Sequence, residues 1–210
     1  MQIHSEFRPD VGSCGIFFGS MWSSKTTELC KVLTMFADLN LHVLYINYVG
    51  DVRQTEKSSE GLTTHHSSFR ELSDKITKIK AERLSDVIVD TFDVIGIDEG
   101  HFFPDLDIEV RKWVLEKNKI VYIASLDGDF MMRPFGKAQN LICLCEPGNV
   151  VKLSAKCMDC LRQETPYHRV QLVNAGFTAK IGGSFEQQKE VGGKDLYIPL
   201  CMKCHKERNK

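Results

Sequence analysis

Apolar residues in the first part of the chain alternate between short unbroken runs and helical spacing. The run at 14–18 predicts a short buried strand, and the apolar positions at 29–39 recur at intervals of three and four, which predicts a helix packed on one face. The β-branched run at 41–47 is typical of a parallel strand covered on both faces. The polar stretch at 50–70 predicts a loop.

The alternation continues toward the middle of the chain. We expect a weaker strand near Ile76, a short helix after Ser85 with the Ser85 hydroxyl as its cap, and an apolar strand within 92–100. Helical spacing returns at 106–114, and the run at 119–125 is typical of another buried strand. Strands that alternate with helices predict right-handed crossovers and a parallel sheet.

The character of the sequence changes near Pro147, after which the apolar runs are short and glycine is frequent. We therefore expect a loose N-terminal tail at 1–12, an α/β domain at 13–148 and a small second domain at 149–210.

Composition excludes several classes of protein. The chain of 210 residues is 42% hydrophobic and contains 12 Phe, which is enough to bury a substantial core. Its 27 basic and 28 acidic side chains give no excess of positive charge, so nucleic acid is not an expected partner. The N-terminus lacks the apolar stretch of a signal peptide and no apolar run is long enough to span a bilayer, so we expect a cytoplasmic protein without a membrane partner.

A glycine loop lies between the first expected strand and helix. Its sequence, GSMWSSKTTEL, matches the phosphate-loop pattern G-x-x-x-x-G-K-[ST] except that Ser24 replaces the second glycine. If Ser24 adopts a left-handed conformation, its Cβ costs about 1–2 kcal/mol. Lys25 would reach the outer phosphates and the Thr26 hydroxyl would face Mg²⁺. The predicted ATP-binding residues of the loop are Gly19, Ser20, Met21, Trp22, Ser23, Ser24, Lys25 and Thr26. A chance match in a polar turn is the alternative.

Two carboxylates end the strand that contains IGIDEG. Asp98 is placed to orient Mg²⁺ or its waters, and Glu99, one residue further, is free to act as a general base on a substrate hydroxyl. A solvated turn is the alternative for this pair.

The chain contains 8 Cys, four of which form two C-x-x-C pairs. Four closely spaced thiolates suit a tetrahedral structural zinc site, and four free thiols are the alternative. The predicted zinc ligands are Cys157, Cys160, Cys201 and Cys204. We interpret the others as small core residues: Cys14, Cys30, Cys143 and Cys145. Together these features predict an α/β fold with a P-loop, parallel-sheet nucleotide-binding core and a small C-terminal zinc-binding domain.

Five segments in order, GSMWSSKTTEL, IGIDEGHFFPD, LDGDFMMRPFG, VVKLSAKCMDC and VGGKDLYIPLCMKC, make the chain resemble the type II thymidine kinases, a cellular, bacterial and viral family. The resemblance implies phosphoryl transfer from MgATP to the 5′-hydroxyl of thymidine, which yields dTMP. It also implies that the zinc-binding domain carries a lasso loop over the nucleoside, and that the protein is a homotetramer.

The resemblance assigns further residues to each substrate. Asp51, Arg53 and His101 fall near the phosphates or Mg²⁺, although the family usually has Gln where His101 stands. Tyr167 falls where the family commonly has a Thr that meets the pyrimidine. The remaining nucleoside-binding residues implied are the apolar wall of Phe102, Leu126, Phe130 and Phe135, the lasso stretch of Gln188, Lys189, Glu190, Val191 and Gly192, and Tyr197. Taken singly, each of these phenylalanines is more often a core residue.

Two other functions stay open. Ser24 and Tyr167 together suggest a catalytically weak relative that binds a nucleotide or serves as an oligomeric scaffold. A zinc-ribbon nucleic-acid binder would need basic surface around the cysteine pairs, and only the short tail CMKCHKERNK offers it.

Overall fold

The structure is a computed structural model that describes residues 10–51, 74–163, 171–182 and 196–208. Its centre is a six-stranded sheet in the order β3-β2-β4-β5-β1-β6. All neighbouring strands of this sheet are parallel. The strands are β1 (Ser13–Gly19), β2 (Val43–Tyr48), β3 (Ile76–Ala81), β4 (Val94–Ile97), β5 (Ile120–Ser125) and β6 (Val150–Leu153). The predicted parallel α/β sheet is confirmed, and β6, which follows the expected boundary at residue 148, is one of its edge strands.

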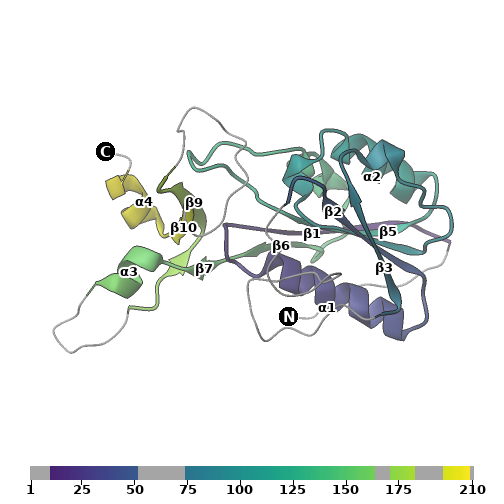
Figure 1. Ribbon diagram of the computed structural model, residues 1–210, viewed down its shortest axis with the longest axis horizontal. Coiled ribbons are helices and arrows are strands. Elements are labelled where there is room, and N and C mark those ends of the chain that lie inside the picture. The colour runs from purple at the N-terminus through teal and green to yellow at the C-terminus, as the bar shows by residue number, and fades with distance from the viewer. Residues whose placement is uncertain (1–9, 52–73, 164–170, 183–195, 209–210) are drawn as a thin grey trace.

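Helices cover both faces of the sheet (Figure 1). Helix α1 (Lys25–Asp38) buries Leu29, Leu33 and Phe36 against one face, and α2 (Leu106–Leu115) buries Val110 and Trp113 against the other, beside the 3-10 segment η3 (Ala138–Leu144). Because each strand points alternate side chains to opposite faces, the four central strands β2, β4, β5 and β1 supply residues to two separate apolar cores.

Two local expectations were wrong. Leu39 was expected on the buried face of α1, but it is the residue after the helix and is 64% exposed. The helix ends there because Asn40 turns the backbone into a left-handed conformation with φ of 61°. Ser85 lies inside the 3-10 segment η1 (Leu84–Asp86) and does not cap it. Asp105 instead accepts hydrogen bonds from the backbone N–H groups of Leu84 and Ser85 at 3.2 and 3.0 Å.

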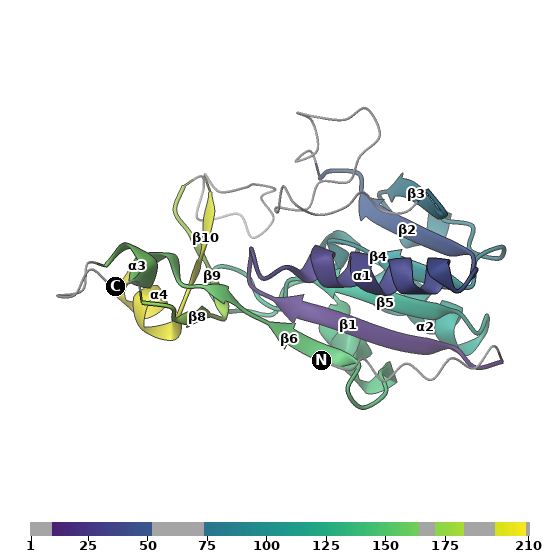
Figure 2. The same ribbon diagram turned by 90° about the horizontal axis from the view of Figure 1, so that it is seen from below.

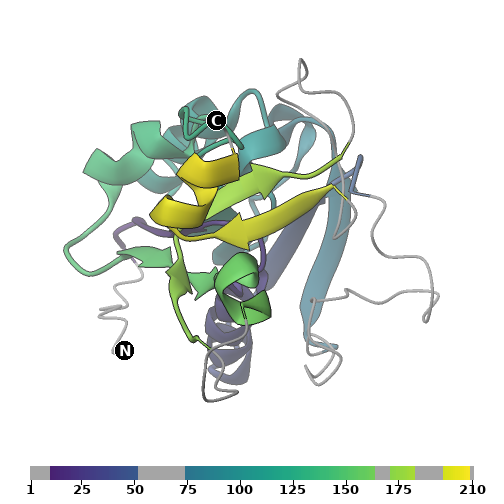
Figure 3. The same ribbon diagram turned by 90° about the vertical axis from the view of Figure 1, so that its left-hand side faces the viewer.

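The C-terminal elements form a small subdomain beyond the carboxyl ends of β1 and β6 (Figure 2). Strand β9 pairs antiparallel with β10, and β7 pairs antiparallel with β8. Seen from this end, the β9–β10 ribbon and the two short helices stand in front of the central sheet (Figure 3). The elements are β7 (Ala155–Lys156), α3 (Met158–Arg162), β8 (Asn174–Ala175), β9 (Phe177–Lys180), β10 (Tyr197–Leu200) and α4 (Met202–Arg208). Across the described ranges, no helix has the length and apolar character that a bilayer crossing requires.

Candidate active site

The glycine loop connects the carboxyl end of β1 to the first turn of α1, as the motif requires. Gly19 is needed at its start because a Cβ there would lie 2.5 Å from the carbonyl oxygen of Leu153 on the neighbouring strand. Lys25 Nζ donates to the Ser20 carbonyl oxygen at 2.8 Å, so the lysine side chain folds back over the loop. The loop therefore has the strand–loop–helix geometry of a phosphate-binding site, with backbone N–H groups gathered at a helix N-terminus.

Ser24 occupies the position of the missing glycine and has a left-handed backbone with φ of 65° and ψ of 25°. Its hydroxyl makes no capping hydrogen bond to α1. The loop therefore keeps the glycine conformation with a residue that has a Cβ, at a cost of about 1–2 kcal/mol.

Asp98, directly after β4, is buried and receives three hydrogen bonds. Oδ1 accepts from Thr26 Oγ1 at 3.1 Å and from the Glu99 N–H at 2.9 Å, and Oδ2 accepts from the Tyr45 hydroxyl at 2.7 Å. Burial, and then the charge of Glu99, raise the pKa of Asp98 to about 7 against these donors. Burial and the charge of Asp98 also hold the pKa of Tyr45 well above its ordinary value, so the phenol keeps its proton and donates.

This donor set fits a hard divalent cation. A carboxylate and a threonine hydroxyl from the phosphate loop meet at 3.1 Å, and Mg²⁺ prefers oxygen ligands of this kind. A buried carboxylate whose ionised form is disfavoured by burial gains most from a nearby positive charge. Thr26 and Asp98 are therefore the residues of this site that could hold Mg²⁺.

Glu99 follows Asp98 in a left-handed backbone conformation with φ of 52°. Its side chain is 13% exposed, and Oε2 lies 3.4 Å from Nε2 of His101, which is almost completely buried. The other ring nitrogen of His101, Nδ1, accepts a hydrogen bond from the Leu126 N–H at 3.3 Å. A carboxylate thus stands beside the phosphate loop with one oxygen next to an imidazole.

An aromatic cluster lies next to the two carboxylates. It contains all the apolar side chains predicted to bind the nucleoside and described by the structure, joined by Met21 of the phosphate loop. The members are Met21, Phe102, Leu126, Phe130, Phe135 and Tyr197. The ring of Phe102 lies 5.0 Å from Tyr48 and 6.1 Å from Phe135, centroid to centroid. The structure therefore brings these residues together from four separate segments of the chain.

The C-terminal subdomain contacts the phosphate loop directly. The Ser20 hydroxyl donates to the carbonyl oxygen of Ala175 at 3.0 Å, and the Met21 N–H donates to Thr178 Oγ1 at 3.0 Å. Both bonds are buried, and each joins residues more than 150 positions apart. The start of the loop is thus fixed between β1 and the strands β8 and β9.

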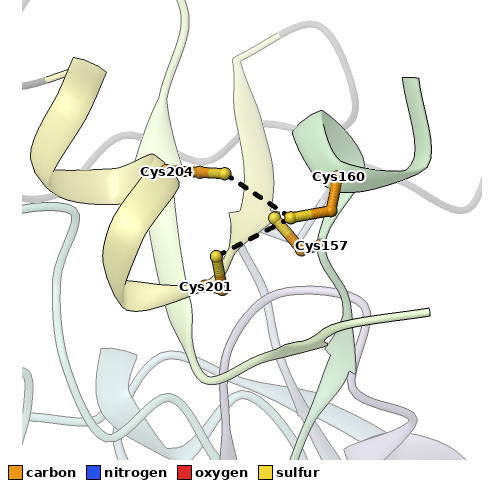
Figure 4. A group of neighbouring side chains, drawn as sticks. All are labelled: Cys157, Cys160, Cys201 and Cys204. Carbon is orange, nitrogen blue, oxygen red and sulfur yellow. Dashed lines mark hydrogen bonds between the residues drawn. The ribbon is translucent and has the colours of Figure 1, made fainter. Parts of the chain in front are cut away.

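The four cysteines of the C-x-x-C pairs form one cluster (Figure 4). Their sulfur atoms all lie within 4.8 Å of one another, and Cys160 Sγ is 3.9 Å from Cys201 Sγ and 3.6 Å from Cys204 Sγ. A tetrahedron of thiolates with Zn–S distances of about 2.3 Å places its sulfurs about 3.8 Å apart, so the cluster fits zinc. Of the other cysteines, Cys14 and Cys30 are buried as expected, but Cys143 is exposed, because it lies on the solvent side of η3.

Some predicted residues lie outside the described part of the chain. These are Arg53, Tyr167 and the lasso residues Gln188, Lys189, Glu190, Val191 and Gly192. Asp51 is described and buried, and its carboxylate accepts from the Asn47 amide at 3.5 Å.

Three residues of the site were not predicted. Tyr45 was interpreted only as part of an apolar strand, although its register opposite Gly96 places it beside the strand that leads to Asp98. Thr178 holds Met21, and Lys180 is buried with its Nζ 5.3 Å from the Phe130 ring centroid and 5.8 Å from that of Tyr197. No local motif marks Thr178 or Lys180, because their contacts arise only when the subdomain packs on the core.

These features define the class of protein. An enzyme that transfers a phosphoryl group to a small acceptor with an apolar face has the parts seen here: a parallel α/β sheet, a phosphate loop, an acid at the end of a neighbouring strand and an adjacent aromatic cluster. The C-terminal subdomain adds a cluster of four cysteines that could hold a metal ion.

Comparison with known proteins identifies the family. A family model described as thymidine kinase matches residues 12–205. The chain is 34% identical over 196 residues to the thymidine kinase of raccoon poxvirus, with 92% of this chain and 97% of that protein covered. It is 35% identical to the thymidine kinase of vaccinia virus (strain Western Reserve) with the same coverage, and 34% identical to the cytosolic thymidine kinase of Gallus gallus, of which 77% is covered. This chain belongs to the thymidine kinase family, and so to the phosphotransferases.

Proposed function

We propose that this protein phosphorylates the 5′-hydroxyl of thymidine with ATP as the donor, forming dTMP and ADP. The observation that carries the proposal is the meeting of Thr26, Asp98 and Glu99 beside the aromatic cluster, with Thr26 Oγ1 3.1 Å from Asp98 Oδ1. Membership of the thymidine kinase family supports the choice of acceptor.

In this proposal the phosphate loop from Gly19 to Thr26 holds the phosphates of ATP through its backbone N–H groups. Lys25 exchanges its contact with the Ser20 carbonyl, 2.8 Å away in the structure, for the outer phosphates. Asp51 and Arg53 act near the same phosphates. Thr26 and Asp98 would hold Mg²⁺, which when bound neutralises charge on the β- and γ-phosphates.

The thymine base packs on the aromatic cluster, and the lasso residues Gln188–Gly192 read its edge through their backbone. Tyr167 lies near the pyrimidine, and Tyr197 closes over the nucleoside. The four cysteines would hold a structural zinc ion, and with the metal bound the ends of the lasso would be fixed, which lowers the entropy lost when the loop orders on the substrate.

In the chemical step the oxygen of the 5′-hydroxyl forms a bond to the γ-phosphorus. The bond from that phosphorus to the β,γ-bridging oxygen breaks, and ADP leaves with its electron pair. The proton of the hydroxyl passes to the carboxylate of Glu99. Because positioning and charge stabilisation supply most of such catalysis, the loop and the two acids carry the reaction.

We also propose that the protein is a homotetramer of the cytoplasm. The support for the tetramer is the resemblance to the type II family, and the support for the cytoplasm is the similarity to the cytosolic thymidine kinase of Gallus gallus. Light scattering on the zinc-loaded protein measures the mass of the assembly and would contradict the tetramer if the monomer mass were found.

The activity is tested with zinc-loaded protein, MgATP and a panel of thymidine, deoxyuridine and deoxycytidine, with the monophosphate products separated by chromatography. We expect dTMP from thymidine, and a loss of turnover of about 10²–10⁴-fold in Glu99→Gln, which preserves the shape of the side chain and removes the base.

Absence of dTMP would refute the proposal. If MgATP still raised the melting temperature of that protein, the chain would be a nucleotide-binding relative without kinase activity. Turnover of another nucleoside in preference to thymidine would correct the acceptor and leave the phosphoryl-transfer roles in place.

A further inference from the structure

An ion pair ties together the two short helices that begin within the cysteine pairs. Arg208 Nε donates to Asp159 Oδ2 at 2.7 Å, and Nη2 of the same arginine donates to Oδ1 at 2.9 Å. Two parallel hydrogen bonds between a guanidinium and a carboxylate add both energy and directional specificity to an ion pair. The Arg208 and Asp159 side chains are 40% and 19% exposed, so the contact lies at the surface of the subdomain with its carboxylate partly shielded from water.

The pair lies next to the cysteine cluster in the sequence of both helices. Asp159 directly precedes Cys160 in α3, and Arg208 follows Cys204 by four residues in α4, which places the two side chains on the same face of that helix. The helices lie on opposite sides of the cluster, with Cys160 Sγ 3.6 Å from Cys204 Sγ (Figure 4). The ion pair and the sulfur contact therefore join the same two helices.

A metal site built from two distant segments binds weakly unless the segments are held together. The residues in contact are 44 positions apart for the sulfurs and 49 for the ion pair, and the ends of such a loop lose conformational entropy when they meet. A contact that holds α3 and α4 together in the absence of metal removes part of that cost before the ion binds.

The charge of Asp159 distinguishes this role from attraction to the metal. Four thiolates around a divalent zinc ion leave a net negative charge, which a neighbouring carboxylate opposes and a neighbouring guanidinium favours. Attraction alone therefore accounts for Arg208 but not for a carboxylate directly before the ligand Cys160. The bidentate bond gives the carboxylate a role that does not depend on its charge toward the cluster.

We infer that Arg208 and Asp159 pre-organise the zinc site: their ion pair holds α3 to α4, so that the four cysteines converge before the metal binds. Both are positioning residues, because the group of side chains that could hold the metal consists of the four cysteines. The inference rests on the proposed zinc site and is independent of the proposed kinase activity.

The test is the zinc affinity of the full chain, measured by competition with a chromogenic chelator at fixed pH and ionic strength. Arg208→Gln keeps a long polar side chain and removes the bidentate contact, and we expect the dissociation constant for zinc to rise about 3–10-fold. Asp159→Asn should raise it by a similar factor, although the loss of a negative charge would by itself favour the thiolate complex. A tighter zinc site in Asp159→Asn would overturn the inference.

A double-mutant cycle isolates the pair. The variant with both Arg208→Gln and Asp159→Asn should bind zinc about as well as either single variant, because the second change removes a contact that the first has already broken. A double variant whose loss equals the product of the two single losses would show that the residues act separately and would refute the inference.

Exposed residues of the same helix supply matched controls. Lys203→Gln removes a positive charge directly before Cys204, and Glu207→Gln removes a negative charge directly before Arg208; both side chains are exposed. Each should leave the dissociation constant within about two-fold of the parent. A rise in Lys203→Gln as large as that in Arg208→Gln would mean that the net charge of α4, and not the ion pair, sets the affinity.

The outcomes separate this inference from the proposed function. Far-UV circular dichroism of the metal-free variants confirms that each is folded before its affinity is compared. A parent that binds zinc but forms no dTMP would count against the kinase and leave the role of the ion pair in place. Equal zinc affinity in the parent, Arg208→Gln and Asp159→Asn would overturn the inference alone, and a parent that binds no zinc would overturn it together with the zinc site.

Discussion

Replacing Ser24 with glycine should stabilise the protein, although it removes a side chain. Ser24 has a φ of 65°, and relief of that conformation is worth about 1–2 kcal/mol. Glycine also lowers the free energy of unfolding by about 0.4–1 kcal/mol, because its backbone loses more conformational entropy than that of serine when the chain folds. The net expectation is a gain of about 1 kcal/mol, or a rise of about 2–4 °C in the melting temperature for a chain of this length.

The assay is urea and thermal unfolding of the zinc-loaded protein, with Ser24→Ala as the control. Alanine keeps the Cβ and removes only the hydroxyl, which makes no capping hydrogen bond, so its stability should stay within about 0.5 kcal/mol of the parent. A glycine variant no more stable than the alanine variant would refute the assignment of strain to the Cβ. Because glycine preserves the loop conformation, MgATP should stabilise both variants against heat.

Three further predictions test other contacts. Tyr45→Phe should cost about 1.5–3 kcal/mol in urea unfolding, because it removes a buried 2.7 Å bond to Asp98; an unchanged midpoint would contradict it. For Asp105, burial alone would raise the pKa, but the N–H groups of Ser85 and Leu84 outweigh it and hold the pKa below 3.8. The ionised carboxylate therefore stabilises the fold above the ordinary pKa of an aspartate, and this contribution is lost as the pH falls. The free energy of unfolding of Asp105→Asn should therefore decrease less between about pH 6 and pH 3 than that of the parent protein. Zinc removal by a chelator should lower the melting temperature and weaken MgATP binding measured by calorimetry; unchanged ATP affinity would show that the loop does not depend on the subdomain.

The sequence was most informative where chemistry is local. The phosphate loop, the acids after β4 and the two cysteine pairs each occupy consecutive or nearly consecutive positions, so their spacing alone indicated their geometry. The left-handed conformation of Ser24 was anticipated as one of two possibilities, and only the structure decided between them. Leu39 was wrongly expected on the packed face of α1, because it continues the apolar pattern after the backbone has left the helix.

Contacts between distant segments could not be predicted. Tyr45 belongs to an apolar run, and its hydroxyl acquires a partner only through the register of β2 against β4. Thr178 and Ser20 meet their partners across separations of 157 and 155 residues, and nothing in their immediate sequence specifies those bonds. Glu99 and His101 lie 3.4 Å apart, which joins the predicted base to a residue that had been assigned to the phosphates or Mg²⁺.

The C-terminal subdomain contacts the catalytic core at more than one point, and one of these contacts comes from α4. His205, next to the predicted zinc ligand Cys204, directs Nε2 at two carbonyl oxygens, 2.9 Å away on Phe130 and 3.2 Å away on Thr178. Since both partners are acceptors, Nε2 must carry the hydrogen. One N–H from α4 therefore ties the aromatic cluster to β9, and the side chain of Thr178 in turn holds the Met21 N–H of the phosphate loop. Disorder in α4 after loss of the metal would loosen the surroundings of both substrates, which is why zinc removal is expected to weaken ATP binding although the cysteine cluster belongs to a different subdomain from the phosphate loop.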